Sequence, residues 1–154
     1  MRLIAHRANL YGSDPKTENS PIQILKCIAL GFDVEVDVWY IDQQLFLGHD
    51  GPQYNIDLDF LVQHKNYLWC HCKHFDSLQY LHQYPDVHIF SHDQDEYTFT
   101  SQKWIWCYPG KQAPYNSIIV MPERFPDLKY EKENIGGVCS DYVGDEQVMK
   151  RYFY

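Results

Sequence analysis

Basic residues are scarce in this chain. Lys and Arg number 13 against 21 Asp and Glu, so the formal net charge is −8 at pH 7. A protein that binds nucleic acid through its phosphates needs a basic surface, and we therefore expect no nucleic-acid partner. A phosphate-bearing substrate would need a metal ion, or a local group of Lys and Arg, to reverse the sign of the charge in its site.

The chain also lacks a long hydrophobic run, a repeat, a low-complexity tract and a linker. With no signal peptide and an odd number of cysteines, five, we expect reduced thiols, a cytoplasmic location and no membrane span. A length of 154 residues suits one domain, over residues 1–154. An aromatic content of 16% argues against disorder. Nothing in the composition fixes the oligomeric state.

Two acids alternate with valines in the segment Val34-Glu35-Val36-Asp37-Val38. In a β-strand, residues two apart project from one face, so both carboxylates lie together and the valines face the other way. Two buried carboxylates repel each other without a counter-charge. One divalent metal ion is the simplest relief, and Mg²⁺, Ca²⁺ or Mn²⁺ suits oxygen ligands. The alternative is an edge strand whose acids face water.

Two histidines, His6 and His49, each follow a short strand-like segment. Histidine titrates near neutral pH, so this pair can supply a general acid and a general base. Arg7 presents a planar fork that suits two oxygens of a phosphate. Its alternative role is a salt bridge, for which Glu18 is the obvious partner.

Four motifs between residues 4 and 50 resemble those of glycerophosphodiester phosphodiesterases, in the superfamily of phosphatidylinositol phospholipase C-like phosphodiesterases. They are IAHRANL at 4–10, ENS at 18–20, GFDVEVDV at 31–38 and LGHD at 47–50. Their order and spacing match the His-Arg, Glu-Asn-Thr, Glu-x-Asp and His-Asp blocks of that family. Beyond residue 75 the resemblance is thin. GGVCSDYVG at 136–144 is similar to the family's last barrel strand, and WIWCYPG at 104–110 is more weakly similar to its penultimate strand.

The resemblance implies hydrolysis of a glycerophosphodiester-like diester, either a small molecule or a lipid headgroup. It implies His6 and His49 as the acid and base, and Glu35 and Asp37 as metal ligands. It also gives Lys73 a phosphate contact. A non-catalytic module that binds a phosphate or a sugar phosphate is the alternative, and a lipid or a polymer such as teichoic acid remains open as substrate.

The segment LWCHCKHF at 68–75 departs from the family, which carries Glu-x-Lys there. The matching residues are His71 and Lys73, which share one face of the strand. An imidazole lacks the negative charge of the missing glutamate, so magnesium should bind more weakly, and manganese or zinc is favoured. Alternatively, His71 contacts the phosphate and not the metal ion.

The same segment offers a second hypothesis, a zinc site made of Cys70, His71, Cys72 and His74. Structural zinc sites space their cysteines by two to four residues and take further ligands from elsewhere. Adjacent residues of a strand alternate between its faces and cannot all reach one ion. We therefore favour the phosphodiesterase site.

Three further polar residues complete the predicted site. We expect Glu18 to lie behind the residues that touch the substrate or the metal ion and to hold Arg7 or a metal-bound water. His92 either shapes the pocket or caps a loop. Asp141 orients Lys73 or binds a hydroxyl of the substrate.

The hydrophobic pattern predicts alternating helices and strands. The helix over 19–30 has Pro21 in its first turn and Gly31 as its stop. Other helices are predicted over 57–64, 75–83 and 144–154. Strands are predicted over 2–6, 33–38, 68–72, 87–91, 104–107, 117–121 and 136–140, with an outlying hairpin piece at 45–47.

Alternation of this kind favours an α/β fold with a parallel sheet. The resemblance implies a barrel of the triosephosphate isomerase (TIM) type, but such barrels usually need about 250 residues. We expect a compact, truncated TIM-type (β/α) barrel with several helices missing in the C-terminal half. Seven of its strands can be placed and the eighth cannot. An open α/β sheet is the alternative.

Overall fold

The computed structural model describes residues 1–153, which contain ten β-strands and four α-helices. The strands are β1 (Arg2–His6), β2 (Asp33–Ile41), β3 (Gln44–Leu47), β4 (Tyr54–Ile56), β5 (Leu68–Cys72), β6 (Ile89–Phe90), β7 (Tyr97–Phe99), β8 (Ile105–Cys107), β9 (Ser117–Val120) and β10 (Ile135–Ser140). The helices are α1 (Pro21–Ala29), α2 (Leu58–Gln63), α3 (Phe75–Leu81) and α4 (Glu146–Phe153), with two short 3₁₀ helices, η1 (Pro122–Arg124) and η2 (Lys132–Asn134).

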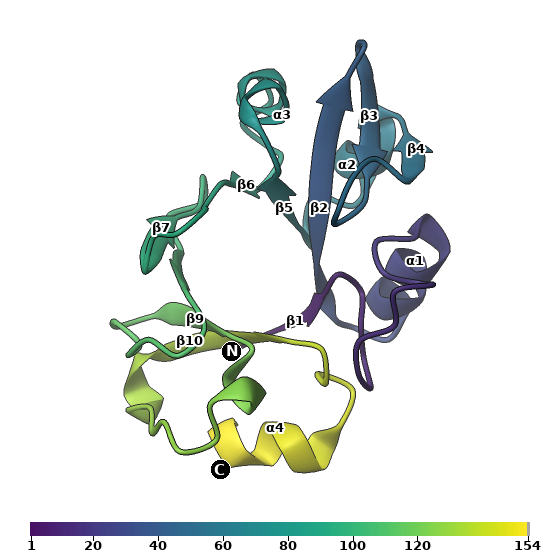
Figure 1. Cartoon of the computed structure of the whole chain (residues 1–154). Helices are drawn as coiled ribbons and strands as arrows, with labels where there is room; N and C mark the ends of the chain where they lie inside the picture. The colour runs from purple at the N-terminus through teal and green to yellow at the C-terminus, as the bar shows by residue number, and fades with distance from the viewer. Residues whose placement is uncertain (154) are drawn as a thin grey trace.

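All ten strands belong to one curled sheet (Figure 1). Parallel ladders join β6, β5, β2, β1, β10, β9 and β8 in that spatial order. On the outside of this set, β3 and β4 extend from β2, and β7 pairs with β8, all antiparallel. Because the parallel strands run the same way, their carboxyl ends share one edge of the sheet.

The predicted truncated TIM-type barrel is wrong. In such a barrel, parallel strands are each followed by a helix and close into a ring. Here the sheet is a curled half-barrel that contains three antiparallel strands, and residues 1–153 form only four α-helices. Within those residues no ladder joins β6 to β8. The reason lies in the connections after β6, which are loops, a hairpin strand and 3₁₀ turns too short to provide crossover helices.

Contacts outside the ladders bridge the opening between β6 and β8. The hydroxyl of Thr98 donates to the carbonyl of Ser91 at 3.2 Å. The Ser101 backbone N–H donates to the Ile89 carbonyl at 2.8 Å, and the Ser101 hydroxyl accepts from the Ile89 N–H at 2.9 Å. We call these contacts between residues 89–91 and 98–101 the seam of the sheet.

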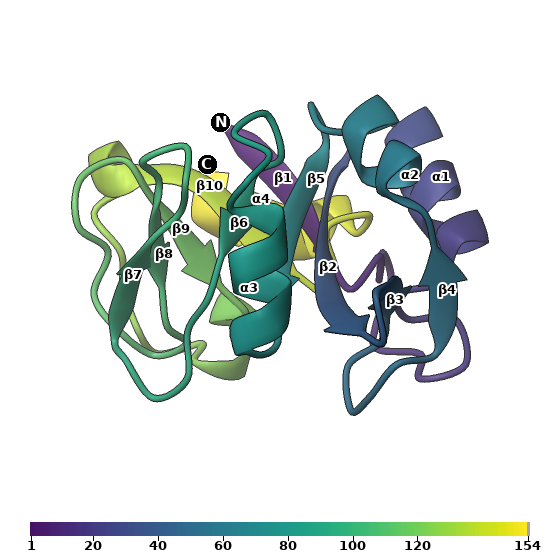
Figure 2. The ribbon, with the colours of Figure 1, turned by 90° about the horizontal axis from the view of Figure 1, so that it is seen from above.

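The helices lie outside the curl, as Figures 1 and 2 both show. The α1 helix starts where the Ser20 hydroxyl accepts from the Gln23 N–H at 3.3 Å, with Pro21 as its first residue. It ends before Gly31, whose φ of 89° is left-handed. Both α1 and α3 pack on β2. None of the helices in residues 1–153 combines the length and the apolar content needed to cross a membrane.

Apolar side chains form two clusters, one on each face of the sheet. The outer cluster lies between the sheet and the helices and contains the three valines of β2 together with Cys70 and Cys72. The inner cluster fills the curl, and its buried members are Ile4, Trp69, Phe90, Trp106, Ile118, Val120, Met121 and Cys139. The inside of the curl is therefore a packed aromatic core, with the polar site above it at the carboxyl edge.

Candidate active site

Eight of the ten predicted site residues line one pocket of about 450 Å³ at the carboxyl edge of the sheet. They are His6, Arg7, Glu35, Asp37, His49, His71, Lys73 and His92. The other two, Glu18 and Asp141, are buried and hydrogen-bonded to residues around the pocket. The predicted constellation is therefore brought together in space.

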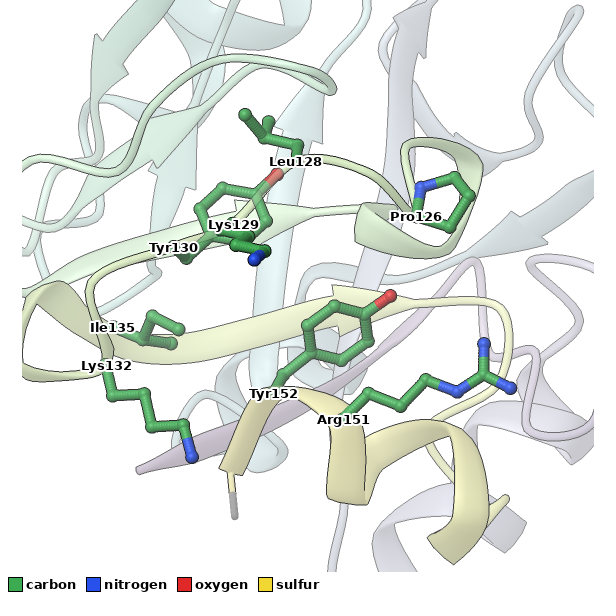
Figure 3. A pocket seen from close by; sticks show the side chains of 8 residues that line it. All are labelled: Pro126, Leu128, Lys129, Tyr130, Lys132, Ile135, Arg151 and Tyr152. Atoms are coloured by element: carbon green, nitrogen blue, oxygen red, sulfur yellow. The ribbon is translucent and has the colours of Figure 1, made fainter.

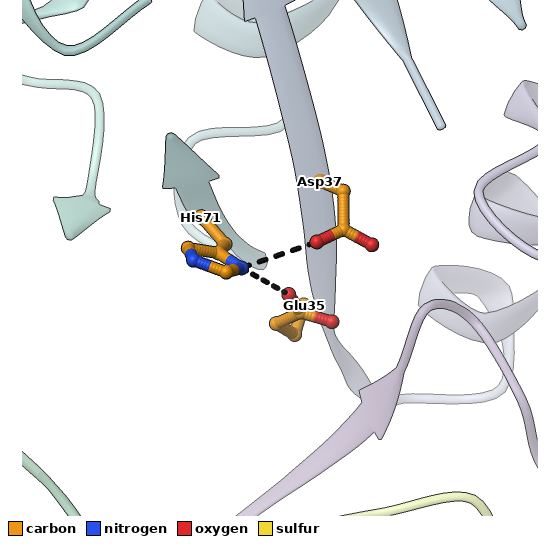
Figure 4. A group of neighbouring side chains, drawn as sticks. All are labelled: Glu35, Asp37 and His71. Atoms are coloured by element: carbon orange, nitrogen blue, oxygen red, sulfur yellow. Dashed lines mark hydrogen bonds and ion pairs between the residues drawn. The ribbon is translucent and has the colours of Figure 1, made fainter. Parts of the chain in front are cut away.

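The two acids of β2 and the histidine of β5 point toward one another (Figure 4). The Nδ1 atom of His71 lies 3.1 Å from Oδ1 of Asp37 and 3.8 Å from Oε1 of Glu35. This arrangement follows from the register, in which Glu35 pairs with Trp69 and Asp37 pairs with His71. One ligand atom from each of the three residues lies within 4.8 Å of the others.

Asp37 is the more firmly held of the two acids. It accepts a hydrogen bond from the Asn19 amide at 3.0 Å, and its backbone N–H donates to Asn19 at 2.9 Å. Lys73 Nζ lies 3.4 Å and Arg7 Nε lies 3.5 Å from its carboxylate. Burial raises the pKa of Asp37, but the hydrogen bond with His71 and the charge of Lys73 outweigh burial and hold it below its usual value. Asn19 lies in the ENS motif but was not predicted as a site residue.

Glu35 has fewer partners, although it is only 3% exposed. Its carboxylate accepts the backbone N–H of Arg7 at 3.1 Å. Burial and the negative charge of Asp37 raise its pKa. A buried acid with so little compensation, beside a second carboxylate and an imidazole, fits a divalent cation, because such an ion would supply the missing positive charge.

His6 is oriented by Asp141. Its Nδ1 lies 2.7 Å from Oδ1 of Asp141, so Nε2 is left for the pocket. Burial lowers the pKa of His6. The hydrogen bond with Asp141 and the negative charges of Glu35 and Asp141 together outweigh burial, so the pKa lies above its usual value. Asp141 was predicted to orient Lys73 or bind a hydroxyl, and the structure places it against His6.

Asn9 is a buried residue that the sequence analysis missed. Its amide donates to Oδ1 of Asp141 at 2.9 Å and to Oε1 of Glu18 at 3.0 Å, while its oxygen accepts the Asp14 N–H at 3.2 Å. Glu18 also lies 3.5 Å from the Arg7 guanidinium, the predicted ion pair. One neutral amide thus connects the acid that holds His6 to the acid that holds Arg7. An asparagine three residues after His6 does not by its spacing indicate a contact with Glu18 and Asp141.

His49 reaches the pocket from the loop between β3 and β4. The preceding Gly48 has φ of 154°, and a Cβ there would lie 2.1 Å from the Gly51 carbonyl oxygen. The ring of His49 bonds to Asp50 through Nδ1 at 2.8 Å. Burial and the positive charge of Arg7 lower the pKa of His49.

The ring of His71 packs against two neighbouring rings. Its ring centroid lies 4.5 Å from that of His92 and 5.2 Å from that of Phe90, with interplanar angles of 9° in both pairs. His92 therefore shapes the pocket, one of its two predicted roles. Its Nδ1 is buried without a hydrogen-bond partner among the described residues, and burial and the charge of His71 lower its pKa to about 4.

The zinc hypothesis for residues 70–74 does not fit the structure. Cys70 and Cys72 are buried in the outer cluster, on the face of β5 opposite His71. The His74 ring bonds to the Tyr40 carbonyl at 3.1 Å and to the Ser77 hydroxyl at 3.2 Å. These four side chains therefore do not converge on one point.

A second pocket lies beside α4 (Figure 3). It is lined by Pro126, Leu128, Lys129, Tyr130, Lys132, Ile135, Arg151 and Tyr152. None of these eight residues is an acid or a histidine, and in Figure 3 Lys132 and Arg151 point to opposite sides of Tyr152. This pocket offers neither a metal-ligand set nor an acid–base pair.

The pocket at the carboxyl edge is thus equipped for metal-assisted acid–base chemistry on an anionic substrate. Comparison of the chain with protein-family models, with curated proteins and with solved structures gives no match in any of the three. The functional assignment therefore rests on the chain's own residues.

Proposed function

We propose that this protein is a metal-dependent phosphodiester hydrolase that acts on a glycerophosphodiester-like substrate. One observation carries the proposal: a single pocket joins the Glu35–Asp37–His71 cluster to two further histidines, His6 and His49. The resemblance of the motifs between residues 4 and 50 to glycerophosphodiester phosphodiesterases supports the choice of substrate.

We assign substrate binding to two of the cationic side chains that line the pocket, Arg7 and Lys73. The guanidinium of Arg7 and the ammonium of Lys73 both lie beside Asp37, at 3.5 Å and 3.4 Å. They are suited to the non-bridging oxygens of a phosphodiester and to the charge that develops there in the transition state. Glu18 keeps the Arg7 side chain in place.

Proton transfer falls to the two histidines. The lowered pKa of His49 keeps its imidazole neutral near pH 7, so it acts as the base that removes the proton of the attacking water or hydroxyl. The pKa of His6 is raised by Asp141 and Glu35 against the effect of burial, which favours its protonated form, so it is suited to donate a proton from Nε2 to the leaving alkoxide. One P–O bond forms and one breaks, and each histidine exchanges one proton.

Glu35, Asp37 and His71 would hold the divalent ion. When bound, such an ion polarises the phosphodiester and offsets the negative charge of the two acids. The Asn19 amide fixes the carboxylate of Asp37, and the stack with His92 and Phe90 fixes the ring of His71.

The test is turnover of glycerophosphodiesters and of a chromogenic diester with Mg²⁺, Ca²⁺, Mn²⁺ or Zn²⁺. We expect His6→Ala and His49→Ala each to lower kcat by at least about a hundredfold, the low end of acid–base catalysis. His82→Ala is the matched control, since His82 is exposed and lies outside the pocket. Unchanged turnover in the His49→Ala protein would refute its role.

A non-catalytic phosphate-binding module is the second candidate. It is favoured by the weak positioning of the His49 ring, because its hydrogen-bond partner Asp50 has a side chain that is 98% exposed. The same assay separates the two functions. Thermal stabilisation by the diester without turnover under any of the four ions would support the binding module.

A further inference from the structure

We propose that the Glu35–Asp37–His71 site selects a first-row transition-metal ion, such as Mn²⁺ or Zn²⁺, over Mg²⁺ and Ca²⁺. This inference rests on the proposed function only in taking the cluster as a metal site. It goes further by naming the chemical class of ion that the cluster prefers.

The first argument is the donor set. The cluster offers two carboxylates and one imidazole nitrogen. Mg²⁺ and Ca²⁺ are hard cations that take oxygen ligands, whereas imidazole binds transition metals well. Two ligands of one small ion, each about 2.1 Å from it, lie roughly 3.0–3.4 Å apart. The nitrogen of His71 is already 3.1 Å from Asp37 and 3.8 Å from Glu35.

The second argument is that His71 is held in place. Its ring packs in nearly parallel planes against Phe90 and His92, whose own centroids are 6.0 Å apart, and its Nδ1 edge faces the two acids. The imidazole is therefore already oriented before an ion binds. A side chain packed in this way is suited to a permanent ligand role.

The third argument is the charge around the site. Asp37 already has Lys73 at 3.4 Å and Arg7 at 3.5 Å, so two positive charges offset its carboxylate. A hard ion held mainly by charge therefore gains chiefly from Glu35 and little from Asp37. An ion that also forms a strong bond to nitrogen gains from His71 irrespective of that offset.

The experiment measures binding directly, by calorimetry with each of Mg²⁺, Ca²⁺, Mn²⁺ and Zn²⁺. We expect Mn²⁺ and Zn²⁺ to bind at least about tenfold more tightly than Mg²⁺ and Ca²⁺, with Zn²⁺ tighter than Mn²⁺. Pulsed electron paramagnetic resonance of the Mn²⁺-loaded protein should show one directly coordinated ¹⁴N nucleus. Histidine labelled with ¹⁵N should convert that signal to a ¹⁵N signal.

Three variants locate the effect. His71→Glu restores an all-oxygen donor set, and we expect it to lose the nitrogen signal and to raise Mg²⁺ affinity relative to Mn²⁺ by at least about tenfold. His82→Glu makes the same chemical change at an exposed position and should behave like the unmodified protein. A combined Glu35→Gln and Asp37→Asn variant should bind none of the four ions at this site.

The outcomes separate this inference from the proposed hydrolysis. Tight Mn²⁺ or Zn²⁺ binding with the nitrogen signal, but without turnover, would support the inference and count against the hydrolase. Turnover with Mg²⁺ and no nitrogen signal would support the hydrolase and contradict the inference about the metal ion. Equal affinity for Mg²⁺ and Mn²⁺, or no binding of any ion, would overturn the inference even if the His71→Glu variant failed to fold.

Discussion

Asn9 shows how one uncharged residue organises several charged ones. Its two N–H groups serve the carboxylates of Glu18 and Asp141, and through them it positions Arg7 and His6. The asparagine amide has two N–H donors and no charge, so it can bind two carboxylates at once without changing the net charge of the site. Asn9 is therefore a positioning residue for the proposed reaction.

Replacing Asn9 by leucine removes these donors and keeps a similar volume. We expect kcat to fall by about tenfold or more while KM changes less, because His6 loses its fixed orientation. The free energy of unfolding should fall by about 1–3 kcal/mol, the usual effect of leaving buried polar groups unpaired. Asn55→Leu, at an exposed asparagine, is the control. A variant that lost stability alone, with kcat intact, would show that Asn9 is purely structural.

If His6 and His49 act as the proposed acid and base, the pH dependence of activity should be bell-shaped. His49 must be neutral, so kcat/KM should rise with pH through its pKa, which lies below the usual 6.5. His6 must be protonated, so kcat/KM should fall as pH passes its pKa, which lies above 6.5. The measurement is kcat/KM against pH at saturating metal ion. His49→Ala should abolish the acid limb of the residual activity, and persistence of that limb would assign it to another group.

At the scale of single elements, the loop between β3 and β4 depends on a glycine. A Cβ at Gly48 would lie 2.1 Å from the Gly51 carbonyl oxygen and 3.1 Å from the Gln53 nitrogen. The backbone must move to admit it, and His49 must move with the backbone. We expect Gly48→Ala to lower kcat by about tenfold or more in the turnover assay. Gly51→Ala adds a methyl group into open space in the same loop and should leave kcat within about twofold; equal losses would contradict this account.

Most elements could be predicted because each shows its own local pattern. The strand predicted over 68–72 is observed as Leu68–Cys72, and the helix predicted over 19–30 is observed as Pro21–Ala29. The short strands β4 and β7 were missed, because three-residue strands at the antiparallel ends of a sheet show too few alternations to be recognised. Their pairing depends on partners distant in sequence, such as β8 for β7.

The site could be predicted better than the surroundings that hold it. Alternation along β2 placed Glu35 and Asp37 on one face, and alternation along β5 placed His71 on the face opposite Cys70. The bonds from Asn9 and Asn19 could not be predicted, because a buried amide is recognised only by the groups it contacts. The stack of His71 with His92 likewise needs two neighbouring strands in known register.

At the scale of the whole molecule, the site reduces the stability of the fold. The pKa of Glu35 is raised on folding, so the folded protein holds its proton more firmly than the unfolded chain does. The stability contributed by the protonated form is therefore present at low pH and is lost as pH rises through the folded pKa. At neutral pH and without metal ion, the charged carboxylate opposes folding.

Glu35→Gln should consequently stabilise the metal-free protein at pH 7 by about 1 kcal/mol, as is common where a functional acid is neutralised. The gain should disappear at acidic pH, where Glu35 is protonated in both states. The measurement is urea unfolding with EDTA at several pH values, and the exposed Glu133→Gln is the control. A gain that did not vary with pH would mean that charge is not its cause.

The fold as a whole was harder to predict than its parts. Seven parallel strands were correctly placed along the chain, but the way the sheet closes depends on connections after β6 that carry no helical pattern. A chain of 154 residues cannot form eight strand–helix units. It covers the remaining distance with the β7–β8 hairpin instead, which runs antiparallel and which no parallel template would suggest.

The seam between residues 89–91 and 98–101 joins the two ends of the run of parallel strands without a ladder. Only a few hydrogen bonds cross it. On one side lies β6, followed by His92, and on the other lies β8, followed by Tyr108.

Amide protons of residues 89–101 should exchange with deuterium faster than those of β1, β2 and β10, because each of these three strands is paired with a neighbour on both sides. Opening at the seam would break no parallel ladder, so we expect the pocket to widen there for a larger ligand while Glu35 and Asp37 of β2 keep their positions.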